Sequence, residues 1–315
     1  MNFGFCRYCF GLFILLITTN LFAQKQVSFT IDDPNTNETP ALPWRDRNNA
    51  ILNTLKDHNL KAAIFVCGMR VNNSKGKELL NSWDNAGHLI CNHSYSHLYY
   101  NSKSLSAENF IRDFFRGDSV IRTYKNYTKL FRFPYLKEGN TDAKRDSMRS
   151  VLAENNYSNG HVTIDASDWF IDAEMSKAIK SDPNVDLTPY REYYIQHILG
   201  RANYYDSLAK KIFNREIKHT LLIHHSLLNA LFLDDLLIAL KENGWILIDA
   251  NQAFKDEIFK EHPPISPCGE SIVWQCAKLN PATSESLRYP AEDGEYEKGP
   301  FEKFVKEYEL KQIKK

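Results

Sequence analysis

Residues 88–97 read His88-Leu89-Ile90-Cys91-Asn92-His93-Ser94-Tyr95-Ser96-His97, a short apolar run followed at once by polar residues. The run His88–Cys91 has the length and composition of a buried strand. After it come two histidines, His93 and His97, four positions apart. If this segment turns helically, both imidazoles lie on one face and can share a metal ion. Histidine pairs at this spacing are common, so a metal site needs further ligands after other apolar runs.

Short apolar runs alternate with amphipathic stretches along most of the chain. The amphipathic stretches have the apolar spacing of helices, and parallel strands between helices are buried on both faces. The pattern predicts an α/β fold, a distorted (β/α)7–8 barrel. The predicted strands are Val27–Ile31, Ala62–Val66, His88–Cys91, Lys129–Phe133, His161–Ile164, Thr220–Ile223 and Trp245–Ile248. The predicted helices are Arg45–His58, one capped by Ser106, one over Asp142–Asn155 capped by Thr141, one over Pro189–Phe213 capped by Thr188, and Leu227–Asn243 ended by Gly244.

The two ends of the chain differ from this central part. Residues 1–23 have the pattern of a secretory signal peptide, with Arg7 before an apolar run and Ala23 at the cleavage position. An uncleaved anchor is the alternative. We expect a secreted or periplasmic protein with no stable membrane span after cleavage. The catalytic domain is expected over residues 24–258, followed by a proline-rich and charged tail, 259–315, that packs on the barrel and ends in a short helix from Pro300 to Ile313.

The composition is that of an ordinary globular protein and argues against some partners. The 315 residues are 43% hydrophobic and 25% charged. Lys+Arg and Asp+Glu both number 39, so the formal charge is +0 and no basic field attracts nucleic acid. Beyond the signal peptide, Cys268 with Cys276, or Cys67 with Cys91, can form disulfides in an oxidising compartment. Buried thiols are the alternative.

Polar residues gather after the C-terminal ends of the predicted strands. In α/β barrels, catalytic groups lie at this end of the strands. These residues are Asp32, Asp33, His93, His97, Arg132, Pro134, Tyr135, Asp165, Asp168, Trp169, His224 and His225. The pattern predicts one site assembled from several strands.

Asp33, His93 and His97 form a set of one carboxylate and two imidazoles. Three protein ligands with open positions suit a catalytic divalent metal ion, with Zn²⁺ favoured and Co²⁺ or Ni²⁺ as alternatives. Such an ion lowers the pKa of a bound water and polarises a carbonyl oxygen. Taken alone, the sequence Asp32-Asp33-Pro34-Asn35 also suits a plain turn. The two histidines at another strand end favour the metal site.

Five motifs in this chain resemble those of the polysaccharide deacetylase family, carbohydrate esterase family four, also called the NodB-homology domain. They occur in the family's order and span about residues 27–250. The motifs are Thr30-Ile31-Asp32-Asp33, His93-Ser94-Tyr95-Ser96-His97, Arg132-Phe133-Pro134-Tyr135, Asp165-Ala166-Ser167-Asp168-Trp169 and Leu222-Ile223-His224. The resemblance implies the distorted barrel of deacetylases, here with a long helical insertion.

The resemblance implies that Asp33, His93 and His97 hold the metal ion. Asp32 would be the general base that takes a proton from the attacking water. Arg132 would fix Asp32 and keep it ionised, because a neighbouring cation lowers the pKa of a carboxyl group.

The remaining motif residues would serve the leaving group and the acetyl group. The backbone N–H of Tyr135 would stabilise the oxyanion. His224, oriented by Asp168, would protonate the leaving amine. The substrate pocket would be lined by Trp169, Leu222 and Pro134.

Three features depart from the family's pattern. Pro34 and Asn35 follow the aspartate pair where the family usually has glycine, so the first loop must turn differently. His225 follows His224 where an aspartate is common, and it is an alternative for the acid. The stretch from Phe170 to Glu216 is long, contains an extra helix and can cover the cleft.

Three functions are consistent with the sequence. The first is a metal-dependent hydrolase that removes N- or O-linked acetyl groups from a carbohydrate. The second is a hydrolase of the same chemistry that acts on a small, non-polymeric amide or imide. The third is a secreted glycan-binding protein that has lost catalysis.

Overall fold

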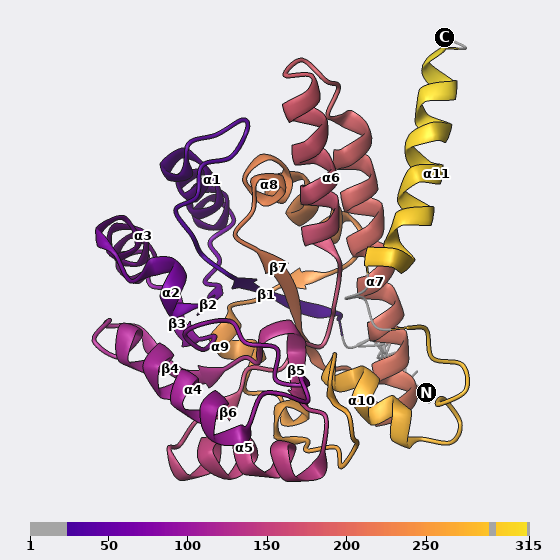
Figure 1. Cartoon of the computed structure of the whole chain (residues 1–315). Coiled ribbons are helices and arrows are strands. Elements are labelled where there is room, and N and C mark those ends of the chain that lie inside the picture. Colours follow the sequence, from indigo (N-terminus) through magenta and orange to yellow (C-terminus); the bar gives the residue numbers. More distant parts are fainter. Residues whose placement is uncertain (1–23, 290–293, 314–315) are drawn as a thin grey trace, which may run out of the picture.

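One parallel sheet with β1 near its centre organises the protein (Figure 1). The computed structural model describes residues 24–289 and 294–313, so the predicted signal peptide, residues 1–23, lies outside the described residues. The strand order is β6-β4-β3-β2-β1-β7, and β8 pairs with the first two residues of β1. The bounds are β1 Gln26–Asp32, β2 Ala63–Val66, β3 Leu89–Asn92, β4 Tyr127–Phe131, β6 Ser158–Asn159, β7 Lys218–His224 and β8 Ile246–Leu247.

A single segment, residues 158–164, joins the two edges of this sheet. Its first part, β6, pairs with β4, and Ile164 forms a parallel bridge to Leu221 of β7. The backbone N–H of Leu222 donates to the carbonyl of Ile164 at 3.1 Å. The sheet therefore curls back on itself, and the predicted distorted barrel is confirmed. The single strand predicted at His161–Ile164 is wrong in extent, because the segment divides its pairing between two partners.

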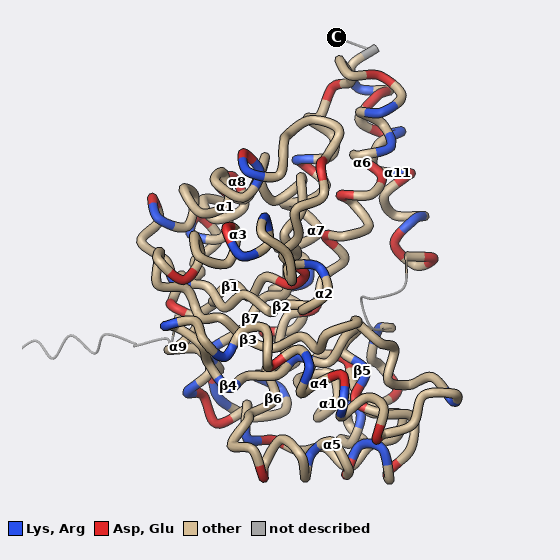
Figure 2. Tube along the Cα trace, turned by 60° about the vertical axis from the view of Figure 1, so that its left-hand side comes forward, with Lys and Arg blue, Asp and Glu red and all other residues tan. Residues whose placement is uncertain are grey.

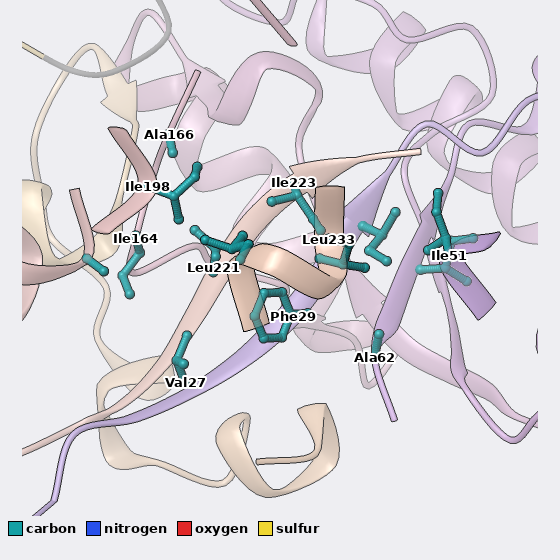
Figure 3. Close-up of a cluster of buried hydrophobic side chains, with 14 of the residues drawn as sticks. Val27, Phe29, Ile51, Ala62, Ile164, Ala166, Ile198, Leu221, Ile223 and Leu233 are labelled. Atoms are coloured by element: carbon teal, nitrogen blue, oxygen red, sulfur yellow. The ribbon is translucent and has the colours of Figure 1, made fainter. Parts of the chain in front are cut away.

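Apolar and polar side chains alternate along β1, and the side chains on both faces of the strand are buried. Val27, Phe29 and Ile31 belong to the main hydrophobic core, where Phe29 lies near residues of β7 and α8 (Leu227–Glu242) (Figure 3). On the other face, the hydroxyl of Thr30 donates to the carbonyl of Leu221 at 2.9 Å. A strand enclosed on both faces needs its polar side chains to be hydrogen-bonded. This alternation places polar groups inside the barrel, below the catalytic end.

The helices follow the predicted pattern, but the predicted cap at Thr188 is wrong, because Thr188 is the first residue of its helix and Leu187 precedes it without a side-chain cap. The hydroxyls of Ser106 and Thr141 accept from the third residues of their helices, as expected of N-caps. Gly244, with φ of 80°, follows α8 in the left-handed region that favours glycine. The bounds are α1 Trp44–Asp57, α2 Gly68–Val71, α3 Ser74–Asn85, α4 Ala107–Ile121, α5 Asp142–Glu154, α6 Asp168–Ser181, α7 Thr188–Phe213, α9 Ala250–Ala253, α10 Ile272–Leu279 and α11 Gly294–Ile313, with short 3-10 turns at Pro134–Leu136 and Glu257–Lys260.

The insertion and the tail pack on one another beside the barrel. In Figure 1, α6, α7 and α11 lie together, and α10 contacts α7. A small antiparallel pair, β5 (Lys137–Gly139) with β9 (Cys268–Gly269), ties the tail to the chain after β4. The predicted terminal helix begins at Gly294, six residues earlier than expected, and its Phe301 ring packs against Phe170 and Tyr193. The domain boundaries at 24–258 and 259–315 stay predictions.

The described cysteines carry free thiols. Cys67, Cys91 and Cys268 are buried and Cys276 is half-buried, so neither of the two disulfides considered from the sequence is formed. Burial raises the pKa of the Cys67 thiol to about 11, which makes it unreactive near neutral pH.

The surface carries both signs of charge. Figure 2 shows basic and acidic residues interspersed along the described chain, including α11. Among the described residues, no helix combines the length and the apolarity that crossing a membrane requires.

Glu297→Ala is expected to lower the free energy of unfolding by about 3–5 kcal/mol, because it leaves a buried guanidinium without its partner. The Glu297 carboxylate in α11 pairs with Arg201 of α7, and both side chains are almost fully buried. Urea denaturation of the full chain measures the loss. The control is Glu302→Ala on the same helix, whose exposed pair with Lys298 spans 3.7 Å, with an expected change below about 0.5 kcal/mol. Equal stability of the two variants would mean that α11 is not docked on α7.

Candidate active site

Asp33, His93 and His97 converge on one point at the C-terminal end of the sheet. Asp33 follows β1 and His93 follows β3, and one ligand atom from each of the three residues lies within 4.8 Å of the others. His97 Nε2 is 3.3 Å from Asp33 Oδ2. His93 Nδ1 lies 2.8 Å from the carbonyl oxygen of Arg132, which orients the ring and leaves Nε2 free for a ligand bond. Two imidazoles and one carboxylate at this separation fit a divalent transition-metal ion.

The helical turn considered for residues 93–97 is not formed. Ser94 and His97 have φ of 63° and 55°, and this left-handed backbone brings the two imidazole rings to a centroid separation of 4.9 Å. Side chains hold the loop: the backbone N–H groups of Tyr95 and Ser96 donate to Asp113 Oδ2 at 3.1 and 2.9 Å. The loop therefore brings His93 and His97 together through left-handed turns rather than through a helical turn.

Strained backbone gathers around this point. Besides Ser94 and His97, Asp33, Tyr135 and Leu136 have φ between 56° and 59°. Each left-handed residue other than glycine costs about 1–2 kcal/mol. Such conformations persist where the surrounding structure fixes them, and they concentrate at functional sites. The strain therefore marks the same place as the metal-ligand set.

Asp32 lies beside the metal-ligand set but bonds to a different partner. Its Oδ1 accepts from Arg132 Nη1 at 2.7 Å, and both side chains are nearly fully buried. Arg132 also donates to the hydroxyl of Thr30 and to the carbonyl of Gly160, each at 2.9 Å, so it reaches from the end of β4 across the inside of the barrel to β1. Asp32 Oδ2 is 3.7 Å from His93 Nε2. Burial raises the pKa of Asp32, and the Arg132 guanidinium opposes that rise.

His224 and His225 both line the cavity, but their hydrogen-bond partners differ. His224 lines the cavity, with its Nδ1 2.7 Å from Asp168 Oδ1, while Asp168 Oδ2 accepts from Asn229 Nδ2 at 2.7 Å. Burial alone would lower the pKa of His224, but the Asp168 carboxylate outweighs it and raises the pKa to about 9. The Nε2 of His225 lies 3.2 Å from Asn48 Oδ1, and burial lowers the pKa of His225 to about 3. Of the two histidines, only His224 combines a carboxylate partner with a cationic form at neutral pH.

These groups open into one cavity of about 600 Å³. Tyr135, Leu222 and Trp169 line it, as the sequence predicts. Pro134 is buried and does not line the cavity; Leu136 takes that place and packs on Leu222 and Val162. Leu136 and Leu222 therefore give the cavity an apolar surface, of a kind that accepts a methyl group.

Sequence reasoning missed the opposite wall of the cavity. The loop after Pro34 forms part of it, and Arg47 of α1 holds this loop by donating to the carbonyls of Asn35 and Asn37 at 2.7 and 2.8 Å. From the insertion, α6 contributes Asp172, Ser176 and Lys180, whereas α7 lies behind it and does not line the cavity. Arg70 of α2 places its Nε 3.4 Å from Asp33 Oδ1. No motif signals these residues, because only the folded chain brings them to the cavity.

Asp165 also lines the cavity, although no role was expected for it beyond its motif. It is buried, and its Oδ2 has no hydrogen-bond partner among the described residues. Burial and the nearby Glu270 carboxylate raise the pKa of Asp165 to about 7.

A parallel barrel with histidines, carboxylates and a cavity at its C-terminal end defines a hydrolase-like α/β protein. Residues 20–158 match the family described as polysaccharide deacetylase. This match confirms the resemblance to the polysaccharide deacetylase family drawn from the motifs. The expectation of a polysaccharide deacetylase-like hydrolase is confirmed at the level of the family. Among curated proteins, none matches this chain.

Solved structures share the fold. A CE4 family pseudoenzyme from Bacillus anthracis is 19% identical with a TM-score of 0.50, over 74% of this chain and 66% of the other. A mutant of that protein with restored enzymatic activity gives 20% and 0.51, over 74% and 68%. A peptidoglycan N-acetylglucosamine deacetylase also gives 20% and 0.51, over 74% and 90%. One fold thus carries both active and inactive proteins, so the activity of this chain must be argued from its own residues.

Proposed function

We propose that the protein is a metal-dependent hydrolase that removes acetyl groups, N- or O-linked, from a carbohydrate. One observation carries the proposal: a carboxylate outside the metal-ligand set, Asp32, is fixed by Arg132 beside that set, and the cationic His224 lines the same cavity. Hydrolysis of an amide or ester needs a base, an oxyanion stabiliser and an acid. The cavity offers a candidate for each.

The residues divide the reaction between them. Asp33, His93 and His97 would hold a divalent ion, with Zn²⁺ as the favoured metal; when bound, such an ion activates water and polarises a carbonyl. Asp32 takes the proton from the attacking water, and Arg132 holds its carboxylate in place. The acetyl methyl rests against Leu222 and Leu136.

The leaving group departs on the other side of the cavity. His224 gives its proton to the departing nitrogen or oxygen, and Asp168 fixes both the orientation of the ring and its protonated form. The backbone N–H of Tyr135 is the proposed oxyanion donor from the protein. Trp169 supplies an aromatic wall for the substrate.

Acetate release from a panel of glycans tests the proposed function. The metal-loaded protein is expected to release acetate from at least one of acetylated chitin, peptidoglycan or xylan fragments, as measured by mass spectrometry. Release from none of the glycans would contradict the proposal.

The wall formed by the first loop and α6 favours a second candidate, a hydrolase of a small amide or imide, because this wall lies where the chain departs from the family's motifs. Turnover of small amides by a protein that leaves every glycan intact would select it. Glycan binding without any turnover in the metal-loaded protein would instead indicate a binding protein. We further propose that the chain is secreted or periplasmic, which N-terminal sequencing of the mature protein, expected to begin at Gln24, can test.

A further inference from the structure

We infer that Tyr99 and Tyr135 form a sugar-stacking subsite directly outside the cavity, which binds the pyranose residue next to the acetylated one. The inference rests on the proposed function and specifies its substrate as an oligosaccharide of N-acetylated pyranose residues. Tyr99 belongs to none of the five motifs and does not line the cavity.

A row of aromatic rings leads outward from the metal-ligand set. The ring of His97 lies edge-on to Tyr135 with centroids 4.6 Å apart, and Tyr135 lies edge-on to Tyr99 with centroids 5.6 Å apart. Tyr135 lines the cavity and Tyr99 does not, so the pair extends the aromatic surface of the cavity beyond its lining. The distance between the Tyr135 and Tyr99 ring centroids is comparable with the length that one pyranose residue adds to a glycan chain.

Both tyrosine rings are open to solvent. Tyr99 is 46% exposed and Tyr135 49%, although large aromatic side chains are normally buried over most of their surface. The described residues include nine exposed large hydrophobic side chains; two of them, Tyr135 and Trp169, line this cavity, and a third, Tyr99, contacts Tyr135. Exposed apolar surface gathered at a cavity mouth indicates a binding surface.

The neighbouring residue explains why Tyr99 stays exposed. Tyr100 is fully buried, stacks on Phe110 at 4.1 Å and donates its hydroxyl to the carbonyl of Lys144 at 2.8 Å. With Tyr100 anchored in the core, its neighbour Tyr99 faces outward. Tyr135 is fixed in turn by its left-handed backbone, with φ of 57°. The two rings are thus held before any ligand arrives, which reduces the entropic cost of binding.

The chemistry of this surface suits a sugar ring. A pyranose presents an apolar C–H face that packs on an aromatic ring, and hydroxyl edges that can bond to the phenol groups or to water. This contact needs no charged group on the sugar, so the subsite selects ligands by the shape of the sugar ring and by the length of the glycan chain. A small amide that fills only the cavity would make no use of it.

The test compares two substrates on the Zn²⁺-loaded protein, N-acetylglucosamine and its β-1,4-linked tetramer. Tyr99→Ala is expected to raise KM for the tetramer about five- to tenfold, the value of one stacking contact, with kcat nearly unchanged and the monosaccharide unaffected. Tyr99→Phe keeps the ring and is expected to stay within about twofold of the wild type. The matched control is Tyr296→Ala, an exposed tyrosine on α11 that also contacts a tyrosine ring. This control is expected to change neither KM.

Calorimetric titration of the tetramer into the metal-free protein separates binding from turnover, with the same loss expected for Tyr99→Ala. Equal losses on both substrates would overturn the subsite, and so would unchanged tetramer kinetics or the absence of tetramer binding to the wild type. If the wild type binds the tetramer through Tyr99 but releases no acetate, the subsite stands and the proposed catalysis fails.

Discussion

Asp33→Ala is expected to bind no divalent ion and to release acetate only at background. Asp33 supplies the sole carboxylate of the three-residue set, and its Oδ2 lies 3.3 Å from His97 Nε2. Removing it leaves two imidazoles, too few to keep an ion in a site that must also leave positions open for water and substrate. Metal content after dialysis, measured by mass spectrometry, and acetate release check the two parts separately.

Asp32→Asn is the informative companion of that variant. It leaves all three metal ligands in place, so the metal content should equal that of the wild type, while kcat falls about 10²- to 10⁴-fold with the loss of the base. Loss of the ion from Asp32→Asn, or full activity of Asp33→Ala, would contradict the division of roles between the two neighbouring aspartates.

The stability of Asp32→Asn needs its own control, because this change leaves the buried Arg132 guanidinium without its anionic partner. Breaking a buried pair costs about 3–5 kcal/mol. The double variant Asp32→Asn/Arg132→Gln removes both charges. It should regain part of the unfolding free energy and none of the activity, which separates catalysis from folding.

The metal-ligand set could be predicted from the sequence because its signal is local. Asp33, His93 and His97 each follow an apolar run that reads as a strand, and parallel strands bring their C-terminal ends together whatever lies between them. The conformation that joins the two histidines could not be predicted. Ser94 in the left-handed region is decided by bonds from the loop to Asp113 on α4, a contact between segments distant in the sequence.

The wall formed by the first loop and α6 could not be predicted from the sequence either, because it also depends on contacts between distant segments. Arg47 lies on a helix that the apolar pattern predicts, but that pattern does not indicate that the Arg47 guanidinium donates to the loop after Pro34. Likewise, the sequence indicated an insertion able to cover the cleft, yet only α6 lines the cavity, and α7 packs against α6 without lining it. The choice between thiols and disulfides also depended on distances that no spacing encodes.

The choice between His224 and His225 was open in the sequence, and the structure turns it into a prediction. His224→Gln is expected to lower kcat about 10²- to 10⁴-fold, because the leaving group then departs without a proton donor. His225→Gln removes a histidine that contacts Asn48 and the Trp83 ring, and is expected to lower stability while leaving the remaining folded protein active. The reverse result would assign the acid to His225.

Asp168→Asn tests how that proton is kept on His224. With the pKa of His224 raised to about 9, the imidazole is protonated at neutral pH, and activity should fall only as pH rises through that value. The asparagine variant loses the carboxylate that raises the pKa, while burial, which lowers it, remains. The descending limb of the kcat/KM profile should therefore move to lower pH, and activity near pH 7.5 should drop about 10²-fold or more. A profile that keeps its descending limb in Asp168→Asn would show that another group donates the proton.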